Sequence, residues 1–223
     1  MKKFLFFFTL IFFSFLHSQE LKDFTIPKGY EKILETKGDL DKDGKDETVI
    51  VFNTDKTPDL ESPGLVRKFY ILKNINGKLK IWKENSTLIF DSKTGFYPND
   101  NKLELIIKNN CLIINQMYFT NSRHTDTSKH TFRFQNGDFY LIGVSINYDD
   151  TCEYNFKNEI NFSTGKVIVS EEYSDCDDGS NRKIPENYHK EFTYKLPKLI
   201  KMSDYKMGKN EIKIPNSKKS FNF

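Results

Sequence analysis

The chain has 223 residues, with 34 lysines and arginines against 31 acidic residues and a formal net charge of +3. Two of the basic residues lie in the first eighteen positions, so the rest of the chain is close to neutral. Because no basic run is interleaved with aromatic residues, the composition argues against nucleic acid as a partner.

The N-terminus has the pattern of a signal peptide. Lys2 and Lys3 precede the apolar stretch Phe4–Leu16, and polar residues follow it. A retained membrane anchor is the other interpretation, but the stretch is shorter than the roughly 20 apolar residues that a spanning helix needs. We therefore expect residues 1–18 to be removed near Ser18, without membrane insertion. The remaining residues, 19–223, are predicted to form a single domain in an exported protein, periplasmic or secreted.

An acidic loop precedes the apolar run Thr48–Phe52, which is predicted to be a strand. The segment before the loop, Tyr30–Lys37, fits either a short helix or a strand. Oxygen-bearing residues at alternate loop positions, with Gly44 permitting a sharp turn, can enclose a hard cation such as Ca²⁺. The alternative is an Asp/Gly turn that binds nothing. The predicted ligands are the side chains of Asp39, Asp41, Asp43 and Glu47, the last directly or through water, and the carbonyl of Lys45.

Turn dipeptides between strand-forming runs predict a series of hairpins. Asn76-Gly77, Asn109-Asn110 and Asn136-Gly137 all favour the positive φ angles of two-residue hairpin turns. The third turn would pair Gln135 with Asp138 and Phe134 with Phe139. These signals, with abundant Phe, Tyr, Ile, Thr and Val, predict a mainly β protein with little helix, an antiparallel meander of hairpins.

A fourth hairpin carries a covalent prediction. Tyr154–Phe162 and Lys166–Tyr173 flank Ser163-Thr164-Gly165, which fits a three-residue loop that pairs Phe162 with Lys166. In that register Cys152 lies opposite Cys176, so we predict a disulfide between them. The alternative is two free thiols brought near by chance. Cys111 would remain as a buried, inert thiol. Residues 215–223 are predicted to form a loose tail.

From Gly38 to Phe52 the chain resembles the Asp-x-Asp-x-Asp-Gly-x-x-Asp calcium loops of FG-GAP and VCBS repeats. Glu47 stands where those loops usually have Asp, and Ile50 stands where an EF-hand would need a Glu. Such loops in series build propellers, but this chain has one copy, which argues against a propeller. The order of the loop, the hairpin at 131–143 and the segment Asn161–Lys166 also resembles an uncharacterised family of exported bacterial proteins. That resemblance implies export and the calcium loop, and no activity.

No sequence motif for catalysis is present: the chain has no Gly-x-Ser-x-Gly elbow, phosphate-binding Gly loop or His-Glu-x-x-His pattern. We name no catalytic residue. We expect a non-enzymatic binding or interaction module with a protein or glycan partner and a structural calcium ion. The alternatives are a secreted polysaccharide hydrolase with structural calcium, and an inhibitor or immunity protein. An enzyme should have a pocket in which titratable residues of shifted pKa converge.

Overall fold

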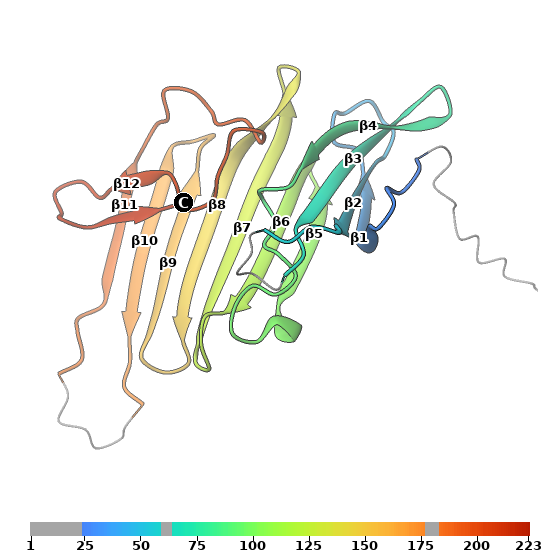
Figure 1. Ribbon diagram of the computed structural model, residues 1–223. Helices are drawn as coiled ribbons and strands as arrows, with labels where there is room; N and C mark the ends of the chain where they lie inside the picture. The colour runs from blue at the N-terminus through green and yellow to red at the C-terminus, as the bar shows by residue number, and fades with distance from the viewer. Residues whose placement is uncertain (1–23, 59–63, 177–182) are drawn as a thin grey trace, which may run out of the picture.

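The computed structural model describes residues 24–58, 64–176 and 183–223, and this part of the chain is mainly antiparallel β-sheet (Figure 1). The predicted signal peptide, residues 1–18, lies outside the described residues. Helix is confined there to one short 3₁₀ turn, η1 (Pro98–Asp100). Among the described residues, no helix has the length and apolar character needed to cross a membrane.

Two sheets follow one another along the chain (Figure 1). The four-stranded sheet has the order of the sequence: β1 (Glu31–Gly38), β2 (Glu47–Asn53), β3 (Arg67–Ile75) and β4 (Lys78–Asn85). The seven-stranded sheet begins at one edge with β5 (Lys102–Lys108), followed by β6 (Cys111–Phe119), β7 (His124–Gln135), β8 (Asp138–Asp150), β9 (Tyr154–Asn161), β10 (Lys166–Tyr173) and β11 (Tyr188–Thr193). A small hairpin, β12 (Glu211–Lys213) and β13 (Ser220–Asn222), completes the described fold.

The predicted turns lie where the dipeptides indicate. Asn76 and Gly77 have φ angles of 54° and 80°, and Asn136 and Gly137 have 50° and 80°. Gln135 pairs with Asp138 and Phe134 with Phe139, as predicted. The segment at 30–37 is a strand, β1, rather than a helix. Strands β7 and β8 extend well beyond the predicted hairpin and reach His124 and Asp150.

The predicted register of the β9–β10 hairpin is wrong by one residue. Asn161, not Phe162, pairs with Lys166. The Phe162 ring turns into the core, 5.3 Å from the ring of Phe223, while Asn161 Oδ1 accepts hydrogen bonds from the backbone N–H groups of Ser163 and Thr164. Burial of the Phe162 ring therefore outweighs the preference for the shorter, three-residue loop that the sequence predicts.

The predicted disulfide between Cys152 and Cys176 is confirmed, with the Cα atoms 5.3 Å apart. The ladder ends at the pair Tyr154 and Tyr173, so both cysteines lie beyond it. The Ser174 N–H still donates to the carbonyl of Glu153 at 2.9 Å, and the one-residue shift leaves the two cysteines close enough to bond. Cys111 is a free, buried thiol whose pKa burial raises, as expected for an inert side chain.

One hydrophobic core joins the inner faces of both sheets. Trp82 on β4 packs against Phe134 and Phe139 at the β7–β8 hairpin, with ring centroids 4.6 and 5.1 Å apart. The chain after β11 covers part of the same face, where Tyr205 and Phe223 are almost completely buried. The outer face of the four-stranded sheet has its own cluster, formed by Ile50, Phe52, Tyr70 and Leu72.

The structure differs from the loose tail predicted at 215–223. Strand β13 pairs with β12, and Phe223 is 1% exposed. The Phe223 N–H donates to the carbonyl of Asn210 at 2.8 Å, and its ring stacks near Tyr205. The segment is mostly polar, so its composition does not reveal that Phe221 and Phe223 pack in the hydrophobic core.

Asp138 connects the β7–β8 hairpin to two other parts of the fold and should make stability depend on acid. Its carboxylate lies 2.8 Å from Lys83 Nζ on β4 and 3.0 Å from Lys201 Nζ. Burial alone would raise its pKa, but the two ammonium groups and the backbone N–H of Phe139 lower it to about 2. A carboxylate with a lowered pKa stabilises the fold above its unfolded pKa of about 4, and this contribution is lost as the pH falls towards 2.

We expect Asp138→Asn to remove about 1 kcal/mol at pH 7, a value reduced for solvent screening of the partly exposed pair. The variant should also lose less stability than the wild type between pH 4 and pH 2. Chemical denaturation across this range measures both, with Asp204→Asn, at an exposed acid, as the control. If the free energy of unfolding fell in parallel for the wild type and Asp138→Asn between pH 4 and pH 2, the lowered pKa of Asp138 would be contradicted.

Candidate metal centre

The acidic loop between β1 and β2 is held by its own backbone. Asp39 Oδ1 accepts the N–H of Lys42 at 2.6 Å, and Oδ2 accepts the N–H of Gly44 at 3.1 Å. Gly44 has a φ of 80°, which a glycine adopts without strain. Asn110, in the β5–β6 turn, donates its amide to the Asp39 carbonyl at 2.8 Å. The loop is thus fixed both internally and to the neighbouring sheet.

Three of the predicted ligands converge. Asp39, Asp41 and Asp43 each present one carboxylate oxygen, and these oxygens lie within 4.8 Å of one another. Asp41 Oδ1 is buried and has no hydrogen-bond partner in the structure. An unpaired buried oxygen of this kind is costly unless a cation or a donor satisfies it.

Glu47 approaches the same loop from its buried side and is 1% exposed. One of its oxygens accepts the N–H of Leu40 at 2.8 Å. Burial raises the pKa of this carboxyl, and the nearby Asp41 and Asp43 charges add to the effect, while the Leu40 N–H and Lys73 oppose it. The described contact of Lys45 is its N–H, donated to Asp43 Oδ1 at 2.9 Å, so its carbonyl as a ligand stays a prediction.

A lysine that the motif does not include lies among these acids. Lys73 Nζ, from β3, contacts Asp41 Oδ2 and lies 3.0 Å from Asp43 Oδ2 and 3.6 Å from Glu47 Oε1. The hydrogen bond to Asp41 is the largest reason why the pKa of Lys73 lies above its ordinary value. The ammonium also lies 5.1 Å from the Trp82 ring. The Lys73 ammonium therefore already neutralises part of the negative charge of the loop.

The pairing of β2 with β3 explains how Lys73 reaches the loop. Thr48 pairs with Leu72, so the next residue outward on each strand, Glu47 and Lys73, meet at the end of the ladder. Local sequence carries no signal for this, but the β2–β3 register would have predicted it. The donor set, carboxylate oxygens with one unsatisfied atom, fits a hard divalent cation such as Ca²⁺. Such an ion would compete with the Lys73 ammonium.

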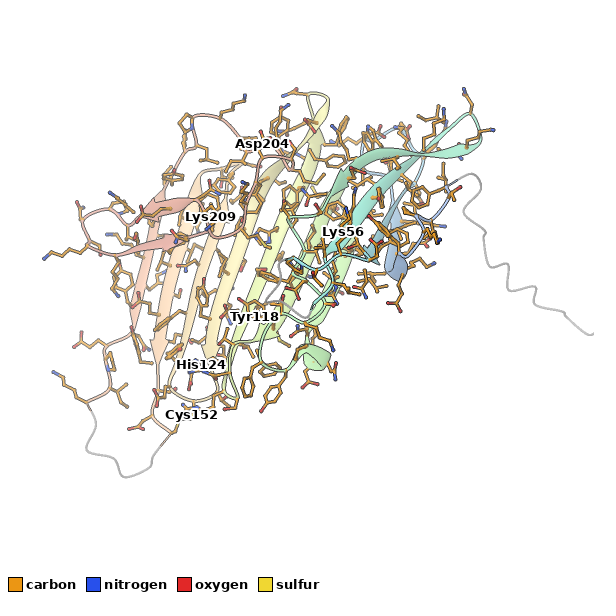
Figure 2. The ribbon with its side chains drawn as sticks, viewed as in Figure 1. Lys56, Tyr118, His124, Cys152, Asp204 and Lys209 are labelled. Carbon is orange, nitrogen blue, oxygen red and sulfur yellow. A yellow bond between two sulfur atoms is a disulfide. The ribbon has the colours of Figure 1, made fainter. Side chains whose placement is uncertain are left out.

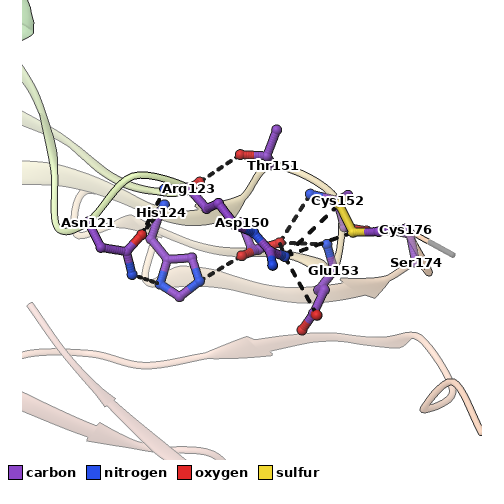
Figure 3. Close-up of polar contacts among 9 residues, drawn as sticks. All are labelled: Asn121, Arg123, His124, Asp150, Thr151, Cys152, Glu153, Ser174 and Cys176. Carbon is purple, nitrogen blue, oxygen red and sulfur yellow. Dashed lines mark hydrogen bonds and ion pairs between the residues drawn. A yellow bond between two sulfur atoms is a disulfide. The ribbon is translucent and has the colours of Figure 1, made fainter. Parts of the chain in front are cut away.

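A second polar cluster surrounds the buried Asp150 at the far end of β8 (Figure 3), and no sequence motif predicts it. Arg123 Nη2 lies 2.7 Å from Oδ1, which also accepts the N–H groups of Cys152 and Glu153. Burial would raise the Asp150 pKa, but Arg123 and these N–H groups hold it well below its usual range. This carboxylate ties the β6–β7 turn to the disulfide.

His124 belongs to the same cluster but lacks the geometry of a general base. Its Nε2 lies 2.6 Å from Asp150 Oδ2, and its Nδ1 lies 2.9 Å from the amide of Asn121 (Figure 3). Nδ1 is hydrogen-bonded to Asn121, and Nε2 lies against an oxygen, Asp150 Oδ2, that has no hydrogen bond of suitable geometry. Neither nitrogen faces a hydroxyl or thiol nucleophile among these contacts. We interpret the cluster as a structural clamp, that is, a set of contacts that holds the β6–β7 turn against the end of β8.

A Ser–His pair lies on the open surface. Ser170 Oγ lies 3.0 Å from His189 Nδ1, across the β10–β11 ladder. The nearest carboxylate, on Glu191, is 3.9 Å from His189 Nε2, which is too far to orient the ring by a hydrogen bond. The imidazole is mostly solvent-exposed, so water is not excluded as nucleophilic catalysis would require.

Comparisons with known proteins add no relative. No family model, curated protein or solved structure matches the chain. The resemblance of the acidic loop to FG-GAP and VCBS repeats therefore stays a prediction.

Proposed function

We propose that the protein is an exported, non-enzymatic binding module whose acidic loop at 39–47 holds a structural calcium ion. The observation that carries the proposal is the convergence of one carboxylate oxygen each from Asp39, Asp41 and Asp43, together with a buried Asp41 Oδ1 that has no hydrogen-bond partner. Calcium would join the loop to the start of β2 through one ion, in place of the Lys73 ammonium that now contacts these carboxylates. The disulfide supports export, because such bonds persist in oxidising compartments.

In the acidic loop and around Asp150, the contacts of the carboxylates favour binding over hydrolysis. A polysaccharide hydrolase needs a carboxylate pair about 5 to 9.5 Å apart on either side of the substrate. The carboxylates at 39–47 are tied to Lys73 and backbone N–H groups, and Asp150 is tied to Arg123. These contacts hold loops in place rather than leave a proton donor facing a cleft.

Thermal and chemical unfolding with calcium tests the metal site. A ligand at 100 times its dissociation constant adds about 2.7 kcal/mol to the free energy of unfolding. Extracellular calcium modules bind at about 10⁻⁴ to 10⁻³ M, so calcium at about 10 mM should give a clear rise in Tm relative to chelator. Magnesium at equal ionic strength should give a much smaller rise. Asp41→Asn should abolish the calcium effect, and Asp204→Asn should preserve it.

Lys73→Met sharpens this experiment. Methionine keeps an apolar stem of similar length beside Trp82 but removes the competing charge, so calcium affinity should rise by roughly tenfold or more. The matched control is Lys78→Met, at an exposed lysine of the same hairpin, which should leave the affinity unchanged. If calcium shifts neither the wild type nor Lys73→Met, the loop is a turn stabilised by lysine and the calcium proposal is rejected.

A further inference from the structure

A hollow of about 240 Å³ lies between the inner face of β6–β8 and the chain that follows β11. It is separate from the acidic loop, near the end of the sheet where Figure 2 labels Tyr118. Aromatic rings form much of its wall: Phe90, Tyr118, Tyr148 and Phe223. The rings of Phe90 and Tyr118 meet edge to face, 4.9 Å apart. Small-molecule sites typically combine such walls with a few polar groups.

The floor of the hollow is a polar line on β7. Asp126, Ser128 and His130 alternate along the strand and so share one face, about 7 Å between neighbours. Ser128 Oγ and His130 Nδ1 are buried and have no hydrogen-bond partner in the structure. Unsatisfied polar atoms in one hollow indicate a place where a ligand or an ordered water belongs.

His130 is 2% exposed and is neutral, because burial lowers its pKa to about 4. Its Nε2 lies 2.9 Å from the hydroxyl of Tyr205. If Tyr205 donates this hydrogen bond, which satisfies the buried hydroxyl, the proton of the ring must be on Nδ1. His130 then offers a hydrogen-bond donor inside the hollow.

Asp126 supplies the only charge of the described lining. Its carboxylate accepts a hydrogen bond from Tyr118 at 2.8 Å, and the charged group that acts on it is His124 rather than a lysine or arginine of the described chain. Burial raises its pKa, and this effect exceeds the opposing hydrogen bond from Tyr118. A partly buried carboxylate among aromatic rings is a complement to an organic cation.

We propose that this hollow binds a small organic ammonium ion that carries a hydroxyl group, with choline as the simplest example. The ammonium would lie between Asp126 and the rings of Tyr118 and Tyr148, and the hydroxyl would pair with Ser128 or His130. The inference names the ligand class of the proposed binding module and so rests on that proposed function. No covalent step is involved.

Calorimetric titration with choline and with 3,3-dimethylbutan-1-ol tests the proposal. The second compound is the uncharged isostere of choline, so it keeps the shape and the hydroxyl and lacks the cation. We expect saturable choline binding and at least roughly tenfold weaker binding of the isostere. Asp126→Asn should weaken choline binding by a similar factor. The control is Asp149→Asn, on the neighbouring strand and the opposite face, which should bind as the wild type does.

Tyr148→Leu provides a second variant, because Tyr148 is partly exposed and its replacement should leave the fold intact. We expect severalfold weaker choline binding from the loss of one ring face. Equal affinities for the two compounds, unchanged binding by Asp126→Asn, or no saturable binding at all would overturn the proposal and indicate that water fills the hollow. A calcium shift of Tm in the same preparation separates the two proposals: if it persists without choline binding, only the ligand assignment fails.

Discussion

Phe139→Ala should lower the free energy of unfolding by about 4 kcal/mol. Phe139 is completely buried, and its ring packs 5.1 Å from Trp82 and 5.3 Å from Phe134. Trp82 belongs to the four-stranded sheet and Phe134 to the seven-stranded one, so truncation opens a cavity where the sheets meet. Denaturant unfolding followed by Trp fluorescence is suitable, because the single Trp lies at this contact.

The matched control is Phe96→Ala, since Phe96 is 56% exposed and should cost less than about 0.5 kcal/mol. A cost below about 1 kcal/mol for Phe139→Ala would mean that the sheets do not share one core. Two separate transitions in the wild type, one seen by Trp fluorescence and one by far-UV circular dichroism, would contradict the shared core as well.

Removing the disulfide should produce the second largest effect, a loss of about 3 kcal/mol in Cys152→Ser/Cys176→Ser. The bond joins two cysteines 24 positions apart in the sequence, so its removal increases the conformational freedom of the unfolded chain. Arg123 Nη2 lies 3.8 Å from Cys176 Sγ, so the clamp around Asp150 should loosen as well. Thermal unfolding of the oxidised protein and the double variant measures the loss.

Reductant gives the control for this prediction. It should lower the Tm of the wild type and leave that of Cys152→Ser/Cys176→Ser unchanged. Thiol titration of the denatured, unreduced protein should find one free thiol, that of Cys111. Three free thiols would show that the bond does not form, and would remove the structural support for export.

Turn chemistry made much of the fold predictable from sequence. Asn-Gly pairs set positive φ angles by themselves, so the hairpins at 76–77 and 136–137 follow from a few adjacent residues. The aspartates of the acidic loop converge for the same reason, because Asp39 bonds to N–H groups three and five positions along the chain. The calcium that would occupy this loop stays a prediction.

Features decided by distant contacts could not be predicted in this way. Phe162 does not pair in the β9–β10 ladder as predicted, because its ring is buried beside Phe223. Residues 215–223 are held by the pairing of β13 with β12 and by the burial of Phe223, although most of these residues are polar. Asp150 and Arg123 are 27 residues apart and meet at the open end of the β7–β8 hairpin. These strands are longer than the sequence pattern predicts.

The sequence by itself determined the antiparallel β class, most hairpins, the disulfide partners and the acidic loop, because each depends on short-range backbone geometry or on spacing across one turn. Only the tertiary structure placed Lys73 among the carboxylates and the unpartnered atoms of Ser128 and His130 in one hollow. Both arrangements depend on strand register and on which later segment of the chain covers the sheet. Those are set by burial of the whole core, which no local pattern encodes.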